Sequence, residues 1–350
     1  MRRPRSLFVG CGVAFLMVFP FLMTPFDRAL AAESEEERTA KLVEGAKKEG
    51  SLLWYATIDV KDGEKILRRF EEKYPFIKAQ MYRAGGDAML SRIMAEARVG
   101  KHLWDVTING GLKGEFQKRK GLFAKYLSPE SKFFPKEFKD PEGYWTDMYL
   151  NVKVLGYNTK LVSPQNVPKS YEELLDPKWK GKMGLVTNAY YWFAIMLKTM
   201  GEEKGLEYMR KLSDQNIQFR TGRTLVTDMV VAGETSLAIA LYNERVEEMK
   251  AKGAPIDWVP LDPVVPQIHP LGISANAPHP NAARLFVDFI LSREGQQVIA
   301  SCYRIPSRVD VDPIVPRLKQ GLKIAPFDCS LAEDYEKHVK MYREILVKRR

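Results

Sequence analysis

The first third of the chain alternates between strand-like apolar runs and segments with helical spacing. Apolar runs rich in β-forming residues occupy 51–57, 77–83 and 104–110, and they predict three strands. In 63–74 and 84–100, hydrophobic residues recur every three or four positions, which predicts two helices. This β-α-β-α-β order predicts a parallel sheet flanked by helices, a fold that binds ligands at the carboxyl ends of its strands.

The same alternation returns in the rest of the chain. The predicted strands are 146–159, 182–187 and 236–242, and an extended, proline-punctuated stretch at 257–277 leads back toward the first half. One predicted helix begins at Thr187. The other predicted helices cover 220–234, 243–253, 279–301 and 330–346.

Two α/β lobes connected by more than one crossing strand predict a hinged clamshell with a ligand cleft between the lobes. We expect mostly parallel sheets flanked by helices in both lobes. The expected boundaries place 32–155 and 266–308 in lobe 1, and 156–265 and 309–350 in lobe 2.

The N-terminus has the three parts of a secretory signal peptide. Residues 1–6 are basic, residues 7–26 are apolar, and Ala29-Leu30-Ala31 fits an A-x-A cleavage site. We therefore expect cleavage after Ala31 and a periplasmic mature chain. An uncleaved membrane anchor is the alternative, because the apolar run is longer than a usual signal core.

Charge and cysteine content narrow the function classes. The 350 residues carry a net charge of +10, and removing residues 1–31 takes away four arginines and one aspartate, which leaves +7. These charges are scattered rather than interleaved with aromatics in a stripe, so we expect no nucleic-acid partner; the basic field either favours an anionic small ligand or is simply solvated surface. Cys302 and Cys329 remain in the mature chain, either as a disulfide or as two free thiols.

Strand ends and glycine-containing turns supply the candidate ligand contacts. Arg83 ends a predicted strand before two glycines and a helix, and Arg223 lies at the start of another helix. Helix N-termini offer free N–H groups and a partial positive charge, and a guanidinium pairs side by side with a carboxylate or phosphate. We therefore expect a small organic anion, either a carboxylate or a phosphonate or phosphate ester. The candidates are Thr57, Arg83, Gly85, Gly86, Asn109, Gly110, Thr187, Asn188, Tyr190, Tyr191, Thr221, Gly222, Arg223 and Thr224.

Three segments, 176–184 (DPKWKGKMG), 232–247 and 279–296, resemble the periplasmic substrate-binding proteins of ABC transporters. Within extracellular solute-binding family 1, the chain resembles the ferric-iron-binding subgroup along nearly its whole mature length. The resemblance implies a type II clamshell that captures a solute by closing and delivers it to membrane permease subunits served by a separate ATPase. It also implies a monomer with no cofactor and no catalytic residues.

The same resemblance raises iron as an alternative cargo. In ferric-binding members a tyrosine pair follows the strand that here ends in Tyr242-Asn243, so one phenol remains and both positions join the candidates. If iron is bound, Tyr242 and Tyr190 are the expected ligands. Tyr190 and Tyr191 are adjacent on a predicted helix and point about 100° apart, so we do not expect both on one ion.

An enzyme is a less favoured class. The sequence contains no G-x-S-x-G, H-E-x-x-H or G-x-x-x-x-G-K-[ST] motif, and its four histidines are far apart. A periplasmic hydrolase and a sensory binding protein that signals to a receptor remain as further alternatives.

Overall fold

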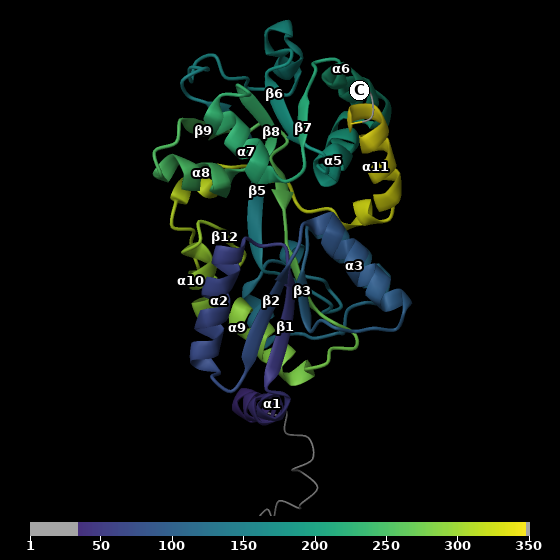
Figure 1. The fold of residues 1–350 in the computed structure, drawn as a ribbon, viewed down its shortest axis with the longest axis vertical. Helices are drawn as coiled ribbons and strands as arrows, with labels where there is room; N and C mark the ends of the chain where they lie inside the picture. Colours follow the sequence, from purple (N-terminus) through teal and green to yellow (C-terminus); the bar gives the residue numbers. More distant parts are fainter. Residues whose placement is uncertain (1–33, 348–350) are drawn as a thin grey trace, which may run out of the picture.

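Two β-sheets, one in each half of the molecule, organise the computed structural model of this chain, which describes residues 34–347 (Figure 1). We call the half that contains the first sheet lobe 1 and the other half lobe 2. Long strand β5 (Tyr149–Asn158) runs from the junction of the lobes into lobe 2.

The sheet of lobe 1 is parallel on one side and antiparallel on the other. Its strands, in order, are β2 (Lys78–Arg83), β1 (Ser51–Ala56), β3 (Val106–Ile108), β11 (Pro270–Ile273) and β4 (Thr146–Asp147). The helices of this lobe are α1 (Glu35–Glu49), α2 (Val60–Lys73), α3 (Gly86–Arg98), α4 (Gly111–Arg119), α9 (Pro280–Leu291) and α10 (Arg293–Ala300). Trp54, Phe70 and Phe286 pack ring against ring between the sheet and the helices, with centroids 5.0–5.2 Å apart.

The sheet of lobe 2 is built around β5. Its strands are β10 (Val265–Gln267), β5, β8 (Leu237–Tyr242), β6 (Met183–Val186) and β7 (Gln218–Arg220), and β9 (Ile256–Val259) and β12 (Ile305–Pro306) also pair with β5. The helices are α5 (Tyr190–Met200), α6 (Glu202–Ser213), α7 (Arg223–Ala232), α8 (Asn243–Ala251) and α11 (Tyr335–Tyr342).

The two-lobe α/β fold is confirmed, but the sheets are mixed rather than mostly parallel. Strands β1, β2 and β3 pair in parallel, as do β6, β7 and β8, because a helix returns the chain between successive strands. The strands that carry the chain between lobes have no such crossover. Strand β11 therefore enters lobe 1 antiparallel, and every partner of β5 is antiparallel to it.

The alternating pattern of the sequence corresponds to the observed elements, with local differences. Helices α4 and α6 have no counterpart among the predicted elements, and Gly85 is the N-cap of α3. The expected lobe boundaries at 155/156 and 265/266 fall within β5 and at β10, the strands near the junction, and they stay a prediction. The expected signal peptide and its cleavage site lie outside the described residues.

The described residues show the state of the two remaining cysteines, whereas the apolar run 7–26 of the alternative membrane anchor lies outside them. Cys302 and Cys329 are both free thiols. Within residues 34–347, no helix combines the length and the hydrophobicity that crossing a membrane requires.

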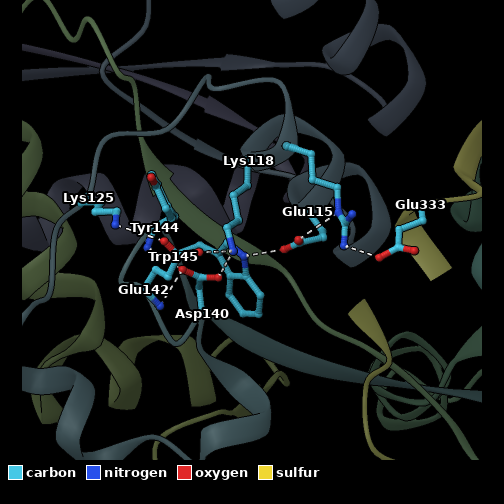
Figure 2. Close-up of polar contacts among 9 residues, drawn as sticks. Glu115, Lys118, Lys125, Asp140, Glu142, Tyr144, Trp145 and Glu333 are labelled. Atoms are coloured by element: carbon cyan, nitrogen blue, oxygen red, sulfur yellow. Dashed lines mark hydrogen bonds and ion pairs between the residues drawn. The ribbon is translucent and has the colours of Figure 1, made fainter. Parts of the chain in front are cut away.

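A polar cluster on α4 fastens lobe 1 to the C-terminal segment (Figure 2). Glu115 accepts a hydrogen bond from Trp145 Nε1 at 3.1 Å and another from Arg119 Nε at 3.3 Å. Arg119 also pairs with Glu333 at 3.2 Å, just before α11, and Lys118 pairs with Asp140. The C-terminal segment that packs on α5 in lobe 2 is therefore also tied to lobe 1.

One buried carboxylate joins the segments that pass between the lobes. Asp147, fully buried at the end of β4, accepts a hydrogen bond from His269 N at 2.5 Å and another from Ser307 Oγ. His269 lies between β10 and β11, and Ser307 follows β12. Asp147 thus holds three crossing segments together at the junction.

We predict that Asp147→Ala lowers the free energy of unfolding by about 3 kcal/mol, because it leaves a buried N–H and a buried hydroxyl without an acceptor. Asp147→Asn keeps one acceptor and adds a donor, so it should cost less than half as much. Urea denaturation followed by tryptophan fluorescence measures both, and equal midpoints for the wild type and Asp147→Ala would contradict this role.

Candidate ligand-binding site

A cavity of about 190 Å³ lies where the two lobes meet at the junction. Since one buried water needs roughly 15 Å³ by the same measure, the space suits a small organic molecule better than a bare ion. Lobe 1, lobe 2 and the crossing strands all contribute to its wall.

The structure brings most of the candidate residues to this cavity. Those that line it are Thr57, Arg83, Gly85, Gly86, Asn109, Gly110, Asn188, Tyr190, Tyr191, Gly222, Arg223, Thr224 and Tyr242. Their role as ligand contacts stays a prediction.

Three candidates lie away from the cavity wall. The hydroxyls of Thr187 and Thr221 contact each other at 3.3 Å beside it. Asn243 is fully buried behind Tyr242, where its amide accepts from Val152 N at 3.2 Å and donates to Leu318 O at 2.9 Å. Asn243 turns inward because α8 begins there, and it ties that helix to β5.

Three helix N-termini open onto the cavity. The N-cap residues of α3, α4 and α7 are Gly85, Gly110 and Gly222, and none of them supplies a side-chain cap. Gly222 has φ 97°, a conformation that only glycine adopts without strain. The uncapped N–H groups and the partial positive charge of each helix end favour an anion.

The floor of the cavity is one face of β5, a strand that the sequence predicts at 146–159 without indicating that its side chains face a ligand. Tyr149, Asn151 and Lys153 alternate along the strand and all line the cavity. Lys153 is only 1% exposed; its Nζ donates to Gln267 Oε1 at 2.9 Å and lies 4.9 Å from the centroid of the Tyr191 ring. A lysine inside the apolar run of β5 was the available signal.

Lys153 and Arg223 have no carboxylate within ion-pairing distance anywhere in residues 34–347. Arg223 stacks on the ring of Tyr242, 4.4 Å from its centroid, and its buried Nε has no hydrogen-bond partner in the described part of the chain. Lys113, which lines the same cavity, pairs with Asp87 at 3.1 Å.

The lysines of this group are poorly solvated. Burial lowers the pKa of Lys153 well below its usual value, and the charges of Arg223 and Lys113 lower it further. Burial also lowers the pKa of Lys113, although Asp87 opposes the change. An anion between these side chains would favour the charged forms of the two lysines.

The other end of the cavity is organised by Arg304. Its guanidinium contacts Asp62 at 2.8 Å in lobe 1 and Glu244 at 3.5 Å in lobe 2, and it lies 4.7 Å from the centroid of the Tyr149 ring. Tyr149 stacks on His269 at 4.1 Å, and burial lowers the pKa of this histidine to about 3, so it is neutral. A second contact across the cleft runs from Asn188 in lobe 2 to Asp87 in lobe 1, at 3.1 Å.

Tyr190 and Tyr191, the adjacent tyrosines at the start of α5, are both held by the C-terminal segment. Tyr190 Oη accepts from Arg343 Nε at 3.2 Å, and Tyr191 Oη accepts from Asp328 N at 3.2 Å. Burial raises the pKa of both phenols and of Tyr242, which disfavours the phenolate that would bind iron. Across residues 34–347, no group of three or more His, Cys, Asp or Glu side chains is arranged to hold a metal.

Comparisons with solved structures agree with this architecture. Iron-bound HitA from Pseudomonas aeruginosa is 22% identical with a TM-score of 0.76, over 84% of this chain and 99% of that one. AfuA from Actinobacillus pleuropneumoniae, with fructose-6-phosphate bound, is 24% identical with a TM-score of 0.75, over 85% and 98%.

Sequence comparison gives similar relatives and shows the family. Iron uptake protein A1 of Synechocystis is 21% identical over 314 residues, which span 85% of this chain and 84% of that protein. Residues 107–327, more than half of the chain, match the family described as bacterial extracellular solute-binding protein. The chain belongs to the bacterial extracellular solute-binding protein family.

Proposed function

We propose that this chain is the periplasmic solute-binding component of an ABC importer, and that its cargo is a small organic anion. The observation that carries the proposal is the burial of Lys153 beside Arg223 and Lys113 in one inter-lobe cavity, with a carboxylate partner for Lys113 alone. A buried charge without a partner is costly, and an anionic ligand would supply the partner.

The geometry suits a carboxylate, a phosphonate or a phosphate ester. Arg223 presents a planar fork of donors, Lys153 adds a point charge, and the glycine-capped ends of α3, α4 and α7 add backbone N–H groups. A Cβ on Gly86 would lie 2.9 Å from Asn109 Oδ1, so the backbone packs closely at this helix end.

Capture follows from contacts on both lobes. Lys113 belongs to lobe 1 and Arg223 to lobe 2, so a ligand that touches both favours the closed arrangement of the hinge. In this proposal a signal peptide that is cleaved after Ala31 exports the chain, which acts as a monomer. The closed form docks on membrane permease subunits, and a separate ATPase drives transport. The ligand is released unchanged, and no cofactor takes part.

A ferric ion is the second candidate, because HitA is iron-bound and the Synechocystis relative is an iron uptake protein. In this chain Tyr242 and Tyr190 would have to ligate it. The Arg223 guanidinium lies on Tyr242, and Arg343 donates to the Tyr190 hydroxyl. Cations at both phenols oppose a trivalent cation, so the organic anion is the better fit.

We predict that Arg223→Ala weakens binding by about 1.5–3 kcal/mol, since it removes a buried charged hydrogen bond. Titration calorimetry with the tightest-binding member of a panel of carboxylates, phosphonates and phosphate esters measures the loss. Arg220→Ala is the matched control, because Arg220 donates to Phe219 O outside the cavity and should leave the affinity unchanged. Equal losses in the two variants would remove Arg223 from the site.

Binding of the anion should also take up a proton. Lys153 has a lowered pKa in the free protein, and an anion beside it raises that pKa. At a pH between the pKa of Lys153 in the free protein and its pKa in the complex, binding adds a proton and the affinity falls as the pH rises.

Calorimetry in two buffers of different ionisation enthalpy, at about pH 8.5 where a phosphate ester is already fully ionised, measures the proton uptake. Lys153→Met should reduce the uptake to the part that Lys113 contributes, whereas Lys160→Met, on the exposed surface, should retain the full uptake. Identical heats in both buffers for the wild type would argue against a titrating lysine in the site.

A further inference from the structure

The end of the cavity near Arg304 contains buried polar atoms that no described residue satisfies. Glu244 is 5% exposed and Asn151 is 1% exposed, and both line the cavity. In residues 34–347, Glu244 Oε2 and both amide atoms of Asn151 lack a hydrogen-bond partner. Leaving such atoms unpaired in a protein interior costs free energy, so these three atoms indicate a missing polar group.

These atoms lie on a line that begins at the end of the cavity that contains Lys153 and Arg223. Asn151 stands between Lys153 and Tyr149 on one face of β5, and alternate residues of a strand are about 6.7 Å apart. Arg304 lies on the Tyr149 ring, and Glu244 is 3.5 Å from Arg304. A ligand whose anionic head meets Lys153 would therefore pass Asn151 before it reaches Glu244.

The chemistry of the two side chains defines the missing group. An ionised carboxylate only accepts hydrogen bonds, so Glu244 Oε2 calls for a donor. Burial raises the pKa of Glu244 to about 7, although Arg304 and backbone N–H groups oppose the change. Asn151 offers a free donor and a free acceptor together, and a hydroxyl group satisfies both, whereas an ammonium group only donates.

We propose that the ligand is a hydroxylated organic anion whose hydroxyl groups pair with Asn151 and Glu244. The inference rests on the proposed function, because its anionic head is the anion already assigned to Lys153 and Arg223. Asn151 and Glu244 are then the residues that distinguish a hydroxylated chain from an alkyl chain of the same length.

The test uses three phosphate esters of equal chain length: butyl phosphate, 4-aminobutyl phosphate and erythritol 4-phosphate. We expect the wild type to bind erythritol 4-phosphate at least tenfold more tightly than butyl phosphate in titration calorimetry. In Asn151→Leu and in Glu244→Ala this advantage should shrink to less than threefold; it is a ratio of two affinities in one variant, so an effect common to both esters cancels. Glu234→Ala, a change of an exposed glutamate, should keep the full advantage.

Three results would overturn the inference. Equal affinity of the wild type for erythritol 4-phosphate and butyl phosphate would show that water satisfies the buried atoms. An advantage that survives in both cavity variants would place the hydroxyl recognition elsewhere. Tightest binding of 4-aminobutyl phosphate, lost in Glu244→Gln, would show that the partner is an ammonium group.

The outcomes separate this inference from the proposed function. Binding of butyl phosphate without a hydroxyl advantage rejects the hydroxylated ligand and leaves the anion site in place. No binding of any phosphate ester, nor of butanoate and its hydroxylated analogue, rejects both.

Discussion

The burial of positive charge between the lobes is the constraint on which the rest of the site depends. Six lysine and arginine side chains and four acidic side chains line the cavity, and of the six only Lys153 and Arg223 lack a carboxylate partner in the described chain. Transfer of a charge out of water is unfavourable unless another group compensates it. The glycine-capped ends of α3, α4 and α7 add further positive potential at the same place, so the whole wall is complementary to an anion.

Because the cavity lies at the junction of the lobes, charge compensation by a ligand is coupled to movement of the lobes. Asp147 holds the crossing segments together, while Arg304 bridges Asp62 of lobe 1 and Glu244 of lobe 2. The cations that would hold the ligand are divided between the lobes and the floor. Compensation of their charge by one bound anion therefore requires the lobes to be close together, which couples binding to closure.

Much of the fold and part of the site could be predicted from the sequence. Strand ends and glycine-containing turns are local features, and they correctly indicated that Arg83, Gly110 and Arg223 would come to one cavity. The side chains on β5 could not be placed in this way: Asn151 and Lys153 alternate with apolar residues, but the strand is buried along its whole length, so the alternation does not show which face meets a cavity. Which face of β5 meets the cavity depends on its pairing with β10, a contact far away in sequence.

The tyrosine pair shows the same limit. Its position on a helix beside the cleft was readable, but its hydrogen-bond partners Arg343 and Asp328 lie 153 and 137 residues further along the chain. Asn243 was misplaced because residues at a strand end can turn outward or inward, and here α8 turns it toward β5.

The central claim is that the cavity binds an organic anion without iron. The most direct measurement is the melting temperature of the mature, ligand-stripped protein with carboxylates, phosphonates, phosphate esters, citrate alone and ferric citrate. At about 100 times its dissociation constant, a true ligand adds roughly 2.7 kcal/mol of stability, which is visible as a higher melting temperature. We expect the melting temperature to rise with an iron-free organic anion. A rise with ferric citrate, and with none of the iron-free anions, would contradict it.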